Sequence, residues 1–134
     1  MFVNTYDIEL ETPNGETVTA SLRLMINGQI KLKKKFNENT VTTLFTSIDD
    51  PEKLSAVFDE ALNWDGNKNT IKRGAELLDL MAMNGLLGML AKQRIITKLA
   101  QVSGILSEDE KEALDAQSDT YVKDLITGAP EKNS

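Results

Sequence analysis

The chain has 134 residues, a net charge of −6, no cysteine and no histidine. It therefore has no disulfides, thiol nucleophiles or thiolate metal ligands, and it lacks the commonest general base. Its 40% hydrophobic and 27% charged residues predict one soluble globular domain, and its acidity disfavours a nucleic-acid surface.

The N-terminal part predicts a β-hairpin over residues 5–24. Apolar and polar residues alternate in residues 6–10 and 17–24, which is typical of half-buried strands. The intervening Pro13-Asn14-Gly15-Glu16 has turn chemistry. Because a lone hairpin is marginal in water, it should pack on helices or pair with another chain. The residues expected at a self-association edge are Tyr6, Ile8, Leu10, Val18, Ala20 and Leu22.

Helices are expected over residues 27–126, but the first segment is ambiguous. Asn27 could cap a short helix that turns Ile30 inward and ends near residue 36. The alternation of Ile30 with Leu32 also suits a third strand. The sequence leaves both alternatives open.

Two further helices are expected before residue 65. Apolar residues recur with helical spacing across residues 41–48. Asp50 and Pro51 then form a helix start, because aspartate caps free N–H groups and proline fits the first helical position. The buried stripe of this second helix is expected to be Leu54, Val57, Phe58, Ala61 and Leu62.

Residues 77–91, LLDLMAMNGLLGMLA, are the most apolar stretch of the chain. We predict that they lie in one long central helix that is capped by Thr70 and ends at Ser103 and Gly104. At about 100° per residue, one face forms a core seam and the opposite face a bounded apolar patch. The predicted seam is Ile71, Leu78, Ala82, Gly85, Met89 and Ile96. The patch, which either binds a partner or is covered within the chain, is Leu80, Met83, Leu87 and Leu90.

The C-terminal part predicts one more helix. Ser107 and Glu110 form a capping box, and the helix should end near Ile126. The domain is therefore expected to span residues 1–127, with a loose tail over residues 128–134.

No targeting or membrane segment is expected. The N-terminus lacks the basic start and apolar run of a signal peptide. Residues 77–91 are shorter than the ~20 residues that span a bilayer, and they include Asp79 and Asn84.

Three polar clusters are candidate sites. Residues 65–76 partly resemble a calcium-binding loop, with oxygen ligands at its first, third, fifth and twelfth places, but Thr70 stands where that loop needs glycine. A basic cluster and several carboxylate pairs are better explained as solvated faces and helix starts. No catalytic residue, metal or cofactor is therefore predicted. The three clusters comprise Asp65, Asn67, Asn69 and Glu76; Lys31, Lys33, Lys34 and Lys35; and Asp49-Asp50, Asp59-Glu60 and Glu108-Asp109-Glu110.

The order of these elements over residues 5–126 resembles the tail assembly chaperones of long-tailed bacteriophages and prophages of Gram-positive bacteria. The similarity comprises the hairpin, the Lys-rich element INGQIKLKKKF, the Pro-started helix DDPEKLSAVFDEALNW, the apolar helix and the coda GILSEDEKEAL.

The resemblance implies a non-enzymatic, self-associating cytoplasmic protein that is absent from the mature virion. Such a protein keeps the tape measure protein soluble and helps recruit tail-tube subunits. The alternative is a small phage or bacterial regulatory inhibitor that docks on one host protein.

Overall fold

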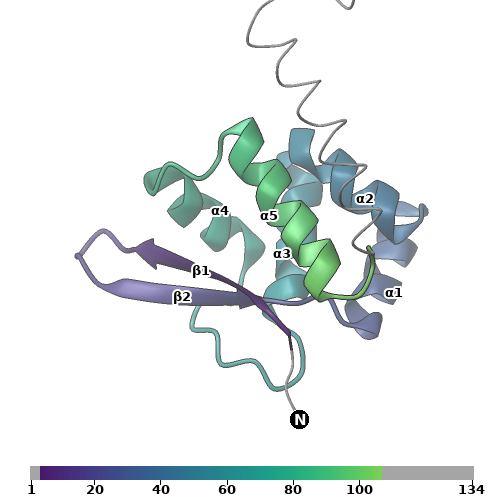
Figure 1. Ribbon diagram of the computed structural model, residues 1–134, viewed down its shortest axis with the longest axis horizontal. Helices are drawn as coiled ribbons and strands as arrows, with labels where there is room; N and C mark the ends of the chain where they lie inside the picture. Colours follow the sequence, from purple (N-terminus) through teal and green to yellow (C-terminus); the bar gives the residue numbers. More distant parts are fainter. Residues whose placement is uncertain (1–3, 107–134) are drawn as a thin grey trace, which may run out of the picture.

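The computed structural model describes residues 4–106. This part of the chain is an antiparallel β-hairpin followed by five α-helices and one short 3₁₀ helix (Figure 1), so the predicted α+β class is confirmed. The last predicted helix and the tail lie outside the described residues. The elements are β1 (Tyr6–Glu11), β2 (Thr17–Leu22), α1 (Ile26–Phe36), α2 (Thr40–Thr46), η1 (Ser47–Asp49), α3 (Pro51–Leu62), α4 (Gly74–Met83) and α5 (Met89–Val102).

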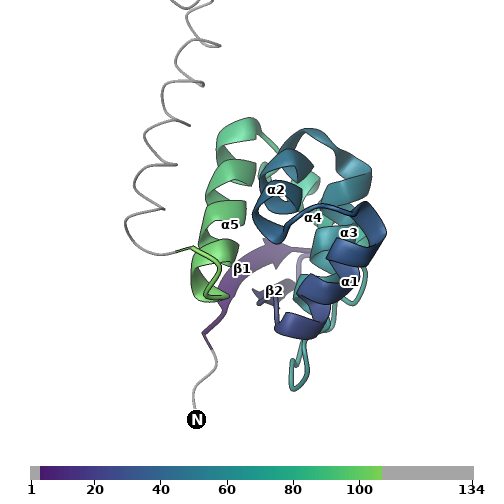
Figure 2. The same cartoon turned by 90° about the vertical axis from the view of Figure 1, so that its right-hand side faces the viewer.

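The hairpin forms one layer and the helices cover one of its faces (Figures 1 and 2). Tyr6 lies opposite Leu22 and Glu11 opposite Thr17, and Gly15 closes the predicted turn with a φ of 85°. The side chains expected at the self-association edge belong to the hydrophobic core of the domain or pack against it. Each of them is buried or partly buried. Self-association through the hairpin would therefore use its backbone edges.

The next three helices largely follow their local signals. Residues 26–36 form a helix, which resolves the ambiguity between helix and strand; Met25 rather than Asn27 is its N-cap. It buries Leu32 and leaves Ile30 47% exposed, so the inward placement of Ile30 was wrong. Asp50 caps α3 as predicted by accepting a hydrogen bond from the Lys53 N–H at 3.2 Å. The predicted buried stripe of α3 is buried throughout.

The single long helix predicted across residues 70–102 is two helices, α4 and α5. Asn84 ends α4, and Gly85 follows with a φ of 72°. The Leu86 N–H bonds the Met81 carbonyl and the Gly85 N–H bonds the Ala82 carbonyl, at 2.7 and 3.2 Å. This is the Schellman arrangement that ends a helix at glycine.

The helix α4 also begins later than predicted, at Gly74 rather than at Thr70. Residue Ile71 precedes it and is 3% exposed, so the chain is already packed in the core before the helix starts. The carboxylate of Asp59 on α3 accepts a hydrogen bond from the Gly74 N–H at 2.5 Å. A side chain from another helix therefore supplies the cap that was assigned to Thr70.

The core face of α4 differs from the predicted seam. Leu77, Leu80 and Met81 are buried, whereas Leu78 is only partly buried and Ala82 is exposed. Because the segment is apolar on almost every side, its periodicity does not select a face, and packing against α3 and the hairpin does.

Candidate functional site

An open, mainly apolar groove of about 530 Å³ lies between α3, α4 and the start of α5. Its size falls within the range of ordinary ligand clefts. Aliphatic residues line most of it, and Glu52, Asp79 and Lys92 supply its charges. The lining residues are Ile48, Pro51, Glu52, Leu54, Ser55, Ala75, Leu78, Asp79, Leu87 and Lys92.

The four residues of the predicted patch do not share one face: Leu80 and Met83 lie on α4, Leu87 in the connection and Leu90 on α5. Leu80 is 8% exposed and belongs to the core. Leu87 is partly buried and lines the groove. Met83 and Leu90, on the two sides of the break, are 58% and 47% exposed. The accessible part of the patch is therefore Met83, Leu87 and Leu90, close to the α4–α5 connection.

The groove is not visible in the sequence, because its walls come from four elements. Ile48 is on η1, Leu54 on α3 and Leu78 on α4. The helical spacing of each segment was visible, but spacing within one helix does not say which helices will stand apart.

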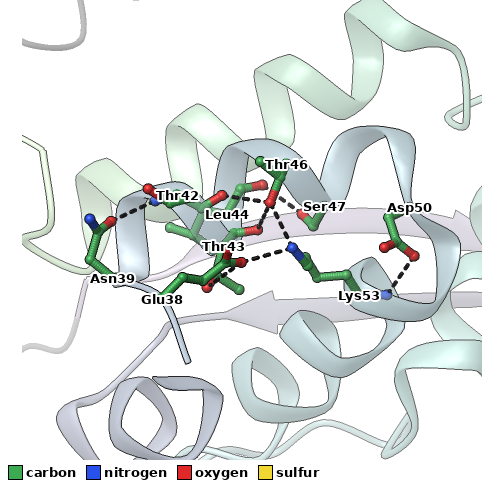
Figure 3. A network of polar contacts seen from close by, with 9 residues as sticks. All are labelled: Glu38, Asn39, Thr42, Thr43, Leu44, Thr46, Ser47, Asp50 and Lys53. Carbon is green, nitrogen blue, oxygen red and sulfur yellow. Dashed lines mark hydrogen bonds and ion pairs between the residues drawn. The ribbon is translucent and has the colours of Figure 1, made fainter. Parts of the chain in front are cut away.

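A polar network holds the η1–α3 wall of the groove in place (Figure 3). Lys53 on α3 donates from Nζ to Glu38 Oε2 at 2.7 Å and to Thr46 Oγ1 at 3.0 Å. Thr43 Oγ1 donates to the same Glu38 oxygen at 3.1 Å. The side chains of Lys53 and Glu38 are only 15% and 25% exposed. The network therefore ties α2 and the α1–α2 loop to the first turn of α3.

The hydrogen bond from Lys53 lowers the pKa of the Glu38 carboxyl below its ordinary 4.5, with smaller help from Thr43 and from the Lys53 charge; desolvation opposes these effects. A carboxyl with a lowered folded pKa contributes its full stabilisation above its unfolded pKa, and this contribution is lost as the pH falls from there through the folded pKa.

We expect Lys53→Met to lower the free energy of unfolding at pH 7, with a difference from the wild type that shrinks below about pH 4.5. Urea denaturation between pH 3 and pH 7 measures this difference. Lys31→Met is the matched control, because Lys31 approaches Glu60 at 4.0 Å with a side chain that is 70% exposed. A pH-independent loss for Lys53→Met would mean that the ion pair contributes nothing.

Two residues of the calcium-like loop, Asn67 and Asn69, use their side-chain oxygens in internal hydrogen bonds. Asn67 Oδ1 accepts hydrogen bonds from the Asn69 N–H and from Lys72 Nζ, at 2.9 and 3.1 Å. The Asn69 side chain is buried against β2. Its Oδ1 accepts a hydrogen bond from the Ser21 N–H, and its Nδ2 donates to the Ser21 carbonyl. Among residues 4–106, no group of three acidic side chains is placed to hold a metal ion.

The other charged clusters also have local structural roles. Asp50 and Asp59 cap α3 and α4, and Glu60 lies near Lys31. Three lysines, residues 33–35, occupy the last turn of α1, where cations favour the negative end of the helix dipole.

Within the described part of the chain, no helix is long and apolar enough to cross a bilayer. Comparison of the chain with protein-family models, with curated proteins and with solved structures finds no match.

Proposed function

We propose that this protein is a non-enzymatic tail assembly chaperone that binds the tape measure protein, keeps it soluble and helps recruit tail-tube subunits in the bacterial cytoplasm. The proposal combines the resemblance in element order with the apolar groove beside the α4–α5 connection. The groove is the observation that carries it, because a tape measure protein is a long helical chain with apolar faces that must be masked before assembly.

The groove has the chemistry expected for docking an amphipathic helix. Aliphatic side chains from η1, α3, α4 and the α4–α5 connection form its floor and walls. Met83, the last residue of α4, and Leu90, in the first turn of α5, do not line the groove, but they are exposed on either side of the connection that carries Leu87. A helix binds such a surface through anchors at positions i, i+3, i+4 and i+7, and methionine adapts to partners of varied shape.

The test is co-expression with the tape measure protein encoded in the same phage or prophage genome. We expect Met83→Gln combined with Leu90→Gln to lower the amount of soluble tape measure protein about tenfold, as when a binding hot spot is removed. Both side chains are exposed, so the fold should persist. Thermal unfolding of the double variant checks this.

The matched control is Ile26→Gln combined with Ile30→Gln on α1. These isoleucines are 67% and 47% exposed, and α1 lies at the opposite end of the molecule from the α4–α5 connection (Figure 1). The control should solubilise the partner as the wild type does. Equal solubilisation by both double variants would contradict partner binding at the α4–α5 connection beside the groove.

Stoichiometry separates this function from the regulatory alternative. A chaperone that self-associates, as the resemblance implies, should form oligomers and bind in many copies along one tape measure chain. A monomer that forms a one-to-one complex with a single folded host protein would favour the inhibitor. Light scattering on the purified complexes distinguishes the two.

A further inference from the structure

Two asparagine side chains occupy places that neighbouring strands would take beside the hairpin. Asn84 accepts from the Glu11 N–H at 2.9 Å and donates to the Glu11 carbonyl at 3.1 Å, on β1. Asn69 pairs in the same way with Ser21 on β2, at 2.7 and 2.9 Å. The backbone groups of Glu11 and Ser21 therefore point away from the other strand of the hairpin.

This observation fixes the direction of the remaining backbone groups of β1. In an antiparallel pair, alternate residues direct their N–H and C=O groups to the partner strand and away from it. Since the backbone N–H and C=O of Glu11 point away from β2, those of Glu9 and Asp7 do as well. Among residues 4–106, none forms a hydrogen bond with these outward backbone groups of Asp7 or Glu9. We call this stretch of backbone the β1 edge.

A cavity of about 240 Å³ runs beside the β1 edge. It is lined by four consecutive residues of β1, residues 6–9, and by none of β2, which places it on the outer side of β1. The opposite wall consists of Leu86, Ala91, Arg94 and Ile95, from the α4–α5 connection and α5. The wall is mainly apolar.

The outer face of β1 is strongly acidic. Asp7, Glu9 and Glu11 are exposed, and within the described part of the chain none of them forms an ion pair. Their opposite residues on β2 are neutral: Ser21, Thr19 and Thr17. Because like charges on directly opposed residues are destabilising, a second copy of β1 is a poor neighbour for this strand.

We propose that the β1 edge binds an extended segment of a partner protein in which basic and apolar residues alternate. Such a strand would hydrogen-bond to the backbone of Asp7 and Glu9, as in β-strand addition. Its lysines or arginines would lie beside the two carboxylates on the outer face. Its apolar residues would lie beside Tyr6 and Ile8 and against the apolar wall.

The net charge of −6 also favours fast association with a basic segment. Arg94 on the opposite wall is exposed and its positive charge opposes this association, but the strand carries three carboxylates, those of Asp7, Glu9 and Glu11. The β1 edge and the α3–α4–α5 groove share no lining residue. The two proposals therefore stand or fall separately.

The probes are two blocked hexapeptides, one of alternating lysine and valine and one of alternating glutamate and valine. NMR titration and amide hydrogen exchange of the full chain measure binding. We expect the lysine peptide to bind at least about tenfold more tightly, since opposite charges pair across neighbouring strands. It should protect the Asp7 and Glu9 amides from exchange.

Glu9→Pro removes the outward N–H but no bond between β1 and β2, because proline is tolerated where an edge N–H faces away from the ladder. It should weaken lysine-peptide binding about tenfold relative to Glu9→Gln, which changes the charge alone. Thr19→Pro is the matched control, because Thr19 lies directly opposite Glu9 and faces the other edge. Circular dichroism checks that all three variants fold.

Three results would overturn the proposal. The first is equal loss of binding in Glu9→Pro and Thr19→Pro, and the second is binding without protection of the Asp7 and Glu9 amides. The third is a dimer, seen by sedimentation and lost in Glu9→Pro, in a chain that does not bind the lysine peptide. That result would assign the β1 edge to a second copy.

Discussion

Gly74→Ala is expected to lower the free energy of unfolding by about 3 kcal/mol or more, the upper range for overpacking a core. A Cβ at this position would collide with the carbonyl oxygen of Ser55 on α3 and would lie 3.0 Å from the Asp59 backbone nitrogen. Both are backbone atoms, so no rotamer change relieves the collision. The variant can fold only if α4 moves away from α3, which also breaks the bond from the Gly74 N–H to Asp59.

Differential scanning calorimetry should record a midpoint about 10 °C lower for Gly74→Ala. The control is Gly88→Ala, because Gly88 has a φ of −74° and no atom within 4 Å of an added Cβ. Its effect should stay within about 1 kcal/mol, since reduced unfolded-state entropy and loss of a preferred N-cap oppose each other. Similar midpoints for both variants would mean that α3 and α4 are not in close contact at Gly74.

The Gly74→Ala substitution should also change the width of the groove. Leu54 and Ser55 line it from α3, and Ala75 and Leu78 line it from α4. The close approach at Gly74 therefore sets how far apart these two walls stand.

The elements that could be predicted from the sequence are those with local causes. Asn14 and Gly15 define the hairpin turn, and Asp50 and Pro51 define the start of α3; in each case the residues that make the signal also make the structure. Gly104 likewise follows the end of α5 with a φ of 76°.

The break between α4 and α5, which was missed, has a local signal as well as a long-range contact. Asn84 and Gly85 carry an end signal of the same kind as Ser103 and Gly104, but the surrounding apolar run favoured one continuous helix. The Asn84 side chain also bonds to Glu11, which lies 73 residues earlier in the sequence. No pattern within a helix reports such a contact.

The candidate surfaces also combine local signals with long-range contacts. Met83 and Leu90 are exposed, and their partner-binding role stays a prediction, whereas burial of Leu80 follows from packing that the apolar pattern does not encode. The β1 edge ends where Asn84 pairs with Glu11, and Asn69 pairs in the same way with Ser21 on the β2 side; both roles are visible only in three dimensions.

Asn69→Asp is expected to destabilise the fold by about 3 kcal/mol at pH 8, in the range for a buried polar group that loses its partners. Asn69 is 5% exposed, and its amide nitrogen donates to the carbonyls of Ser21 and Leu62 at 2.9 and 2.8 Å. The substitution keeps the acceptor for the Ser21 N–H but turns a charged oxygen toward two carbonyl oxygens. It therefore weakens the attachment of the α3–α4 loop to β2.

The pH dependence of Asn69→Asp identifies this mechanism. Burial beside carbonyl oxygens raises the folded-state pKa of the introduced carboxyl. The loss of unfolding free energy is therefore complete above that pKa. It becomes smaller as the pH falls, because the carboxyl regains a proton that it can donate. Asn84→Asp provides the matched comparison: it makes the same kind of pair with Glu11, at a half-exposed position where water can replace the lost donors. Urea denaturation at pH 5 and pH 8 should give a loss of about 1 kcal/mol for Asn84→Asp, and a larger loss there than for Asn69→Asp would contradict the buried pairing of Asn69 with Ser21.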